Sequence, residues 1–280
     1  MSVTTANKKA GVGETIGTIL RDHIVYRKQI VKLAVSDLRR TYRASALGWA
    51  WAVIKPLVTI FVYWFAFSIG LRKGGDIAGY PFVLWLICGI VPWFYMSEML
   101  TLGTECILRN RYLVTKMKYP VSTIPTFTSI SKFTVHLILL VLTILIFILT
   151  GNMPTIYMLQ LPFYMVCNFL FFTGWALFAA PIAAISTDFS NLVKSFVTAV
   201  FWLSGILWEV DSMHHALARR LLMLNPVTFL CNGYRNCFVY KTWFFEQPKR
   251  LLYFAVALVV LYALAFWSYR RTRSEMADVL

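Results

Sequence analysis

The chain has 280 residues, of which 59% are hydrophobic and 14% charged, and its mean hydropathy is +0.66. This composition excludes an ordinary soluble domain, and it also excludes a disordered chain, which lacks the apolar surface that drives packing. The net charge of +15 would indicate nucleic acid as the partner of a soluble protein, whereas in a membrane protein it reports orientation and anionic headgroups. We therefore expect an all-α membrane protein with membrane lipids, and no nucleic acid, among its partners.

Residues 1–49 predict a cytoplasmic N-terminal segment. The first fifty residues hold nine Lys or Arg and no early apolar run, so they do not form a secretory signal. Near the end of this segment, apolar and basic residues separate at about 100° per residue. The apolar stripe comprises Val31, Val35, Leu38 and Tyr42, and the polar side comprises Lys32, Ser36, Arg39, Arg40 and Arg43. The pattern predicts a basic amphipathic helix that lies along the cytoplasmic interface.

This helix has two open roles. In the first, the helix anchors the chain on anionic lipid. In the second, a lipid phosphate or pyrophosphate binds at the entrance to a transport path to Arg39, Arg40 and Arg43, with Tyr42 beside them. Arginine suits this second role because guanidinium groups bind phosphate oxygens bidentately.

Six apolar segments reach the roughly 20 residues that a bilayer core requires. They are residues 50–71, 80–103, 133–150, 156–185, 191–210 and 251–269. Together they predict a six-span domain over residues 50–269, followed by a cytoplasmic tail over 270–280. Residues 211–250 are too polar and too interrupted to span, which favours an external re-entrant hairpin. Its polar positions include Arg219, Arg220, Asn225 and Pro226.

The positions of the cations predict that both termini face the cytoplasm. With six spans, eighteen of the 27 Lys and Arg lie on the side of the termini and eight on the other side, which agrees with the positive-inside rule. Six of the eight fall in residues 211–250, where they either contact an anionic substrate or extend toward headgroups.

The lack of catalytic motifs in the sequence favours a chain that is not an enzyme by itself. The sequence has no G-x-x-x-x-G-K-[ST] motif for a nucleotide, no metal-binding spacing among its four histidines, and no other catalytic constellation, so we expect no cofactor or metal on this chain. We expect His136 to hydrogen-bond between helices. Whether Cys231 and Cys237 form a disulfide stays open.

Two features of the predicted spans leave alternatives open. Glu98 is the only acid well within a span, so it is either the coupling site of an ion-driven secondary transporter or a polar contact at a helix end. The first two spans are also rich in aromatic residues, which serve helix packing or line a path for sugar rings. The candidates for such a lining are Tyr63, Trp64, Phe67, Trp93 and Tyr95.

Four strings resemble the permeases of ABC-2 type polysaccharide exporters. They are KLAVSDLRRTYRASALGWAWAVIKP at 32–56, GIVPWFYMSE at 89–98, RNRYLVTKMKYP at 109–120 and LNPVTFLCNGYR at 224–235. Their order is more specific than any one of them, and the resemblance extends from about residue 23 to the tail. Within this family, WLSGILWEV at 202–210 resembles the wall teichoic acid branch more than the O-antigen or capsule branch.

The resemblance implies a complex of two permeases and two separate ATPase subunits, which bind ATP and Mg. A coupling helix within 112–120 would dock on the ATPase, unless this segment is an ordinary basic loop. The residues at this contact would be Arg109, Arg111, Tyr112, Lys116, Lys118, Tyr119 and Pro120. A lipid-linked polymer would enter near the amphipathic helix and pass between the two permeases. The polymer expected from 202–210 is wall teichoic acid, whose phosphates would contact Arg219, Arg220 and Arg235; the alternative is an O-antigen or capsular polysaccharide.

Overall fold

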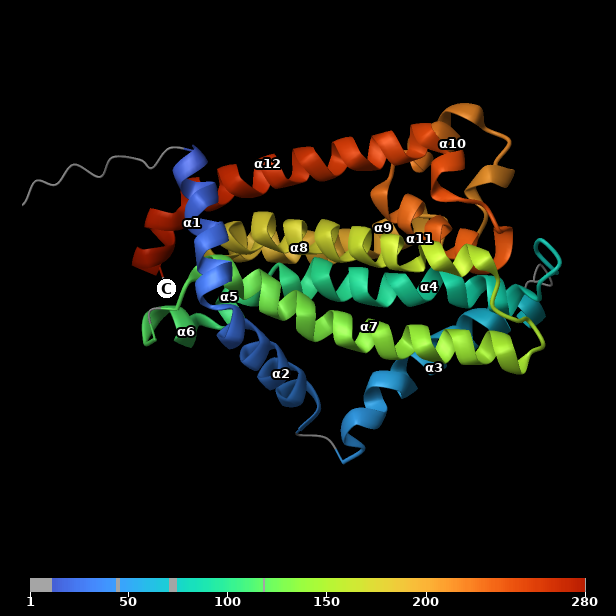
Figure 1. Ribbon diagram of the computed structural model, residues 1–280, viewed down its shortest axis with the longest axis horizontal. Helices are drawn as coiled ribbons and strands as arrows, with labels where there is room; N and C mark the ends of the chain where they lie inside the picture. Colours follow the sequence, from blue (N-terminus) through green and yellow to red (C-terminus); the bar gives the residue numbers. More distant parts are fainter. Residues whose placement is uncertain (1–11, 44–45, 71–74, 118, 280) are drawn as a thin grey trace, which may run out of the picture.

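The computed structural model describes residues 12–43, 46–70, 75–117 and 119–279, and these residues form helices and no β-strand. Lys118, Arg72 and Lys73 lie outside the described residues. The helices, shown in Figure 1, are α1 (Val12–Val25), α2 (Arg27–Arg43), α3 (Trp51–Trp64), α4 (Phe82–Glu98), α5 (Cys106–Arg109), α6 (Arg111–Thr115), α7 (Ile124–Leu149), α8 (Leu161–Ile185), α9 (Thr187–Leu203), α10 (Ala216–Met223), α11 (Pro226–Arg235) and α12 (Pro248–Val279).

Five helical segments of the described chain are long and apolar enough to cross a membrane. They are Gly48–Gly70, Phe82–Gly103, Val121–Leu149, Ile156–Ile185 and Pro248–Thr272. Five of the six predicted spans therefore have a counterpart. The third begins well before residue 133, because its polar residues Ser129 and Ser131 are buried and hydrogen-bond to Thr173 of α8 and Asp37 of α2.

The remaining prediction, a span over 191–210, has no counterpart among these five segments. The helix there is α9, which begins at Thr187 and ends at Leu203. Its 17 residues measure about 26 Å at 1.5 Å per residue, which is at the short end of the range for a membrane-spanning helix. Gly205 then takes a positive φ of 60°, which ends the helix, since this left-handed conformation favours glycine.

The long helices run side by side, and α4 lies in the middle of them (Figure 1). Of its most apolar window, 78% is buried inside the chain, compared with 17% for Gly48–Gly70. Helix α12 packs along α8, and α4 packs against α7 and α11. Helix α4 thus forms the core, while α3 keeps most of its surface for lipid or another chain.

Helices α1 and α2 cross the end of the bundle where α12 finishes (Figure 1), which we call the inner end. Residues 31–43, predicted as an amphipathic helix, are helical as part of α2, but the buried stripe differs from the predicted one. Ile30, Ala34 and Leu38 are the buried residues of α2, whereas Val31 and Val35 are 56% and 43% exposed. The buried stripe repeats every four residues and packs on α7.

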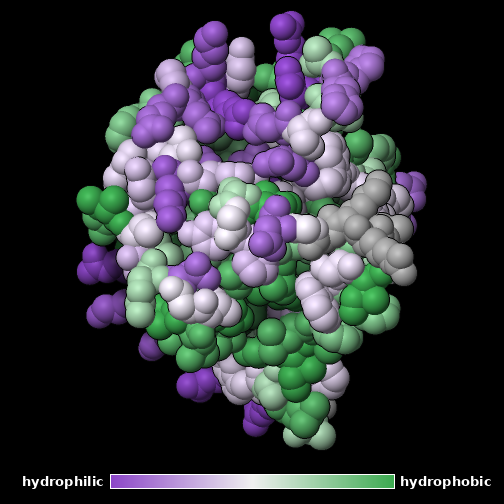
Figure 2. Space-filling view, turned by 90° about the vertical axis from the view of Figure 1, so that its right-hand side faces the viewer, coloured by the Kyte–Doolittle hydropathy of each residue, from purple (hydrophilic) through white to green (hydrophobic). Residues whose placement is uncertain are grey.

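Residues 211–250 form a compact region at the opposite, outer end. Helix α11 begins with Asn225, whose side chain accepts a hydrogen bond from the Val227 N–H, and with Pro226 in its first turn. Gly233 allows α11 to approach α8 closely, because a Cβ there would lie 2.2 Å from the ring of Tyr164. Seen from the outer end, hydrophilic residues gather along the upper part of the molecule, where α10 lies, and hydrophobic residues dominate the lower part (Figure 2).

Three segments continue a helix with π-helical turns. They are Phe65–Gly70 after α3, Met99–Gly103 after α4 and Asn236–Tyr240 after α11. A π turn holds one more residue than an α turn, and such turns are frequent at functional sites.

Candidate functional site

The basic residues of α2 that the sequence singled out line one open groove. Its volume is about 790 Å³, and it is lined by Lys32, Arg39, Arg40 and Arg43, together with Ser36 and the two exposed valines of α2. Residues four apart lie on one face of a helix, which brings Lys32, Arg39 and Arg43 to the same side. The groove therefore presents several cations beside an apolar surface, an arrangement that suits a phosphate attached to a lipid chain.

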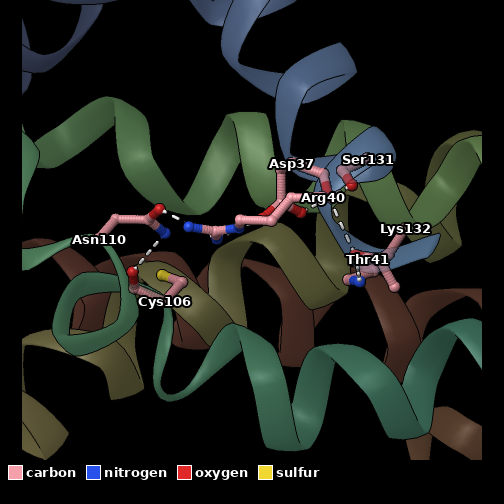
Figure 3. Close-up of polar contacts among 7 residues, drawn as sticks. All are labelled: Asp37, Arg40, Thr41, Cys106, Asn110, Ser131 and Lys132. Carbon is pink, nitrogen blue, oxygen red and sulfur yellow. Dashed lines mark hydrogen bonds and ion pairs between the residues drawn. The ribbon is translucent and has the colours of Figure 1, made fainter. Parts of the chain in front are cut away.

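One of these arginines also joins α2 to the rest of the inner end. Arg40 donates to the Asp37 carboxylate at 2.9 Å and to the Asn110 Oδ1 at 3.4 Å, so it lies between α2 and the residue that precedes α6 (Figure 3). Asp37 accepts a second hydrogen bond from Ser131 of α7 at 2.8 Å. Because its bonds link two elements, Arg40 has a structural role, and among the described residues no such bond is made by Arg39 or Arg43.

The predicted coupling segment is a short exposed projection at the inner end. Helix α6 covers Arg111–Thr115, and after a turn the chain continues to Tyr119. The exposed residues here include Arg109, Arg111, Tyr112 (66% exposed), Lys116 and Met117. Tyr119 and Pro120 are half-buried, and Tyr119 packs edge-on against Tyr26, the residue before α2, at a ring separation of 5.5 Å. The projection thus offers aromatic and cationic side chains to another protein.

A carboxylate that the sequence did not single out ties this region to α9. Glu105 accepts a hydrogen bond from Ser190 at 2.7 Å and forms an ion pair with Lys194. Burial favours a raised pKa for Glu105, but the hydrogen bonds from Lys194 and Ser190 and the charge of Lys194 outweigh burial, so its pKa lies below the ordinary value. The tie connects the segment leading into α5 and α6 with α9.

We expect this tie to weaken in acid. Because the pKa of Glu105 is lowered in the folded protein, its stabilisation is complete above the ordinary value of 4.5 and is lost as pH falls through the folded value. The pair is partly exposed, which limits the effect to under about 1 kcal/mol. Melting temperatures of Glu105→Gln and the native chain should therefore differ at neutral pH and converge toward pH 3. Glu246→Gln, an exposed acid at the outer end, is the control; a difference that persists at pH 3 would contradict the assignment.

The outer end is organised around Arg235, which differs from the exposed, substrate-facing residue that the sequence suggested. Arg235 is 1% exposed. Its guanidinium donates to the carbonyl oxygens of Gly205 at 2.8 Å and Ile206 at 2.6 Å, and its Cζ lies 3.5 Å from the centre of the Trp85 ring. A buried cation is costly unless its donors are satisfied. Arg235 therefore fastens the turn after α9 to α4 and α11.

A second set of contacts closes the same region. Tyr240 donates to the Glu209 carboxylate at 2.5 Å and accepts from the Trp85 Nε1 at 2.8 Å. Arg219 and Arg220, which the sequence grouped with Arg235, are exposed on α10. Of the three predicted external arginines, these two face outward and remain accessible.

The remaining candidates lie within the bundle. Trp93 and Tyr95 are 6% and 2% exposed; Trp93 packs on Phe201 at 5.5 Å, and the Tyr95 hydroxyl shares a hydrogen bond of 2.7 Å with Ser129. Their aromatic rings thus serve packing inside this chain.

Six further residues that the sequence singled out differ in accessibility or partner. Tyr63, Trp64 and Phe67 of the first span are half-buried. The expected interhelical hydrogen bond of His136 is confirmed, at 2.8 Å from the hydroxyl of Tyr234. Cys231 and Cys237 are buried free thiols.

The comparison with known protein families decides the class of this chain. The family model described as ABC-2 type transporter matches residues 28–239. The chain belongs to the ABC-2 type transporter family. It is similar to the O-antigen export system permease protein RfbA of Myxococcus xanthus, at 25% identity over 261 residues, which are 93% of this chain and 98% of the relative. It is also similar to an O-antigen export system permease protein RfbA of Klebsiella pneumoniae, at 22% identity over 253 residues, which are 90% of this chain and 94% of that relative.

As an ABC-2 permease, the chain is the membrane component of a transporter. The matched region begins at the first turn of α2 and ends in the π-helical turns after α11. It therefore includes the basic groove, the projection at α6 and the buried Arg235.

Proposed function

We propose that this chain is the permease subunit of an ATP-driven exporter of a lipid-linked polysaccharide of the O-antigen type. Family membership supports the transport class, and the names of its relatives support the cargo. The observation that carries the proposal is the groove on α2, where Lys32, Arg39 and Arg43 face the same side beside apolar residues. A lipid-linked polysaccharide joins its glycan to the lipid through phosphate, and this groove has the chemistry to bind that junction.

The relatives favour O-antigen over the teichoic acid that residues 202–210 suggested. The structure supplies a reason why that string is a poor guide to cargo. Its carbonyl groups at Gly205 and Ile206 bind Arg235, and a Cβ at Gly205 would lie 2.3 Å from Val210. A side chain at Gly205 does not fit this turn, so at this position the string follows the packing of the turn and carries no information on the cargo.

The proposed energy source is ATP bound, with Mg, by a separate subunit that docks on the projection at α6. A permease with two conformations is driven when ATP binding to its partner favours one of them. By the positive-inside rule we expect the protein to lie in the cytoplasmic membrane with its inner end, including α2 and α6, facing the cytoplasm. A second copy of the chain would complete the polymer path, and its natural contact is α3, the span with the least buried surface.

The direct test of the proposal is depletion of the protein in its own cell. Surface polysaccharide should fall while lipid-linked polysaccharide accumulates inside, and an ATP-binding subunit should copurify with the tagged permease. Normal surface polysaccharide, or loss of a phosphate-rich wall polymer in its place, would overturn the proposed cargo.

We expect the double substitution Arg39→Gln and Arg43→Gln to weaken recognition of the lipid-linked substrate. Each charge-assisted hydrogen bond contributes about 1.5–3 kcal/mol, so the concentration for half-maximal stimulation of ATP hydrolysis should rise at least about tenfold. The measurement is ATPase activity of the reconstituted complex against lipid-linked polysaccharide. Arg27→Gln with Lys28→Gln removes the same charge from the other end of α2 and is the control. Equal stimulation of ATP hydrolysis in both double variants would mean that α2 only anchors the chain on lipid.

A further inference from the structure

A cavity of about 540 Å³ lies between the last turn of α2 and helices α3, α4 and α7. This volume is within the range of small-molecule sites. Its lining contains charged and aromatic side chains together, including Tyr42, Trp51, Lys55, Glu98 and Lys132. Tyr42 lines the cavity and Arg43 lines the basic groove, so consecutive residues of α2 line the two hollows.

The charged groups of this cavity have unused hydrogen-bonding capacity within the described chain. The carboxylate of Glu98 has no hydrogen bond or ion pair there, and the cations whose charges act on it most strongly are Lys132 and Lys55. Lys132 is 5% exposed, and its ammonium group makes one long hydrogen bond, of 3.4 Å, to the Thr41 hydroxyl. An ammonium group has three donors and a carboxylate has about four acceptor sites. Such groups are costly to bury unless a ligand or a partner group satisfies them.

The chemistry of the lining matches a sugar ring. Ring hydroxyls both donate and accept, so one sugar can donate to the carboxylate of Glu98 and accept from the ammonium of Lys132. Trp51 and Tyr42 add aromatic rings, and the face of either ring can cover the apolar face of a pyranose. Burial and the negative charge of Glu98 raise the pKa of Tyr42 to about 12, so its hydroxyl stays protonated and able to donate at neutral pH. The two lysines and one carboxylate leave one net positive charge, which suits a sugar that carries a phosphate.

We propose that this cavity binds the sugar directly joined to the phosphate of the lipid-linked substrate, with Glu98 accepting from its hydroxyls and Lys132 donating to them. The inference rests on the proposed function and adds a specificity site to it. The groove on α2 binds the phosphate whatever glycan is attached, whereas the cavity distinguishes a lipid that carries a sugar from one that does not.

The test compares two synthetic probes, a short prenyl pyrophosphate and the same lipid carrying one hexose. Binding to the reconstituted complex is measured by titration. The native complex should bind the hexose-bearing probe at least tenfold more tightly than the bare pyrophosphate. Glu98→Gln should lose this preference and leave the affinity for the bare pyrophosphate unchanged. Tyr42→Phe, which keeps the ring and removes the hydroxyl, should reduce the preference in part, and Glu246→Gln at the outer end is the matched control.

Each outcome separates this inference from the proposed function. If the native complex binds both probes equally well, the cavity has no sugar specificity, and the inference fails while the proposed function stands. If Glu98→Gln weakens both probes equally, Glu98 acts by positioning α2, and the inference also fails. If the native complex binds neither probe, the proposed function fails with it. Melting temperatures near that of the native complex confirm that the variants are folded.

Discussion

Replacing Arg235 with methionine should destabilise the protein more than any other single change considered for this chain. The substitution leaves the buried carbonyl oxygens of Gly205 and Ile206 without their donors. An unsatisfied buried polar group costs about 1–3 kcal/mol, so the free energy of unfolding should fall by about 2–6 kcal/mol. Equilibrium unfolding in mixed micelles measures this difference. Arg219→Met, at an exposed position on α10, should change it by less than about 0.5 kcal/mol.

A second variant tests the same geometry without removing the charge. A Cβ at Gly89 of α4 would lie 2.3 Å from the Nη2 of Arg235. The guanidinium is held by two carbonyl groups and by the Trp85 ring, so it cannot move without losing those contacts. Gly89→Ala should therefore destabilise, whereas Gly17→Ala in α1, where a Cβ meets nothing within 4 Å, should be neutral or stabilising, because alanine favours a helix. If Gly89→Ala and Arg235→Met both keep the native stability, contacts other than those of Arg235 hold the turn after α9.

The second large effect is expected at the α6 projection. Tyr112→Ala combined with Lys116→Glu removes an exposed aromatic ring and reverses a charge. Exposed aromatic and cationic residues often dominate a protein interface, and truncating one costs about 2 kcal/mol or more at such positions, or roughly thirtyfold in affinity. We expect copurification of the ATPase subunit and polysaccharide export to be lost together. The melting temperature of the permease alone should stay unchanged, since both side chains lie on the surface.

Lys249→Glu, an exposed charge reversal at the start of α12, is the control for net charge. It should leave ATPase association intact. If the α6 variant still binds the ATPase and exports polymer, the docking surface lies elsewhere on the inner end. Lys118 can be reversed in the same way to extend the tested surface along the segment.

The sequence predicts the spans well because burial in lipid leaves a simple signal. Long apolar runs identify five spans to within a few residues at most ends, and Asn225 with Pro226 has the pattern of a helix start, which α11 confirms. The predicted bounds 191–210 differ from those of α9, Thr187–Leu203, because composition alone cannot show that Gly205 ends a helix. The run stays apolar after the helix has turned away.

The misplaced residues are those whose partners are distant in the sequence. Arg235 lies in a segment of mixed polarity, so hydropathy placed it at the surface, while its contacts come from residues near 85 and 205. Its apolar and small neighbours Cys231, Gly233 and Phe238 were the available signal of burial. Similarly, the sequence left Glu98 isolated because Lys132 falls just before the third predicted span. The structure brings them together by starting α7 earlier and placing it beside α4.

The π-helical turns at Met99–Gly103 determine which neighbours two acids can reach. Glu98 and Glu105 are seven residues apart, and in a regular α-helix this spacing would place them on nearly the same face, two turns apart. The extra residue of the π turn rotates the residues after it by about 100°. Glu98 consequently faces the cavity beside α2, and Glu105 reaches Ser190 and Lys194 of α9. The wider turn thus leaves the two carboxylates on different faces of one continuous stretch of helix, so that Glu98 contacts the cavity beside α2 while Glu105 contacts α9.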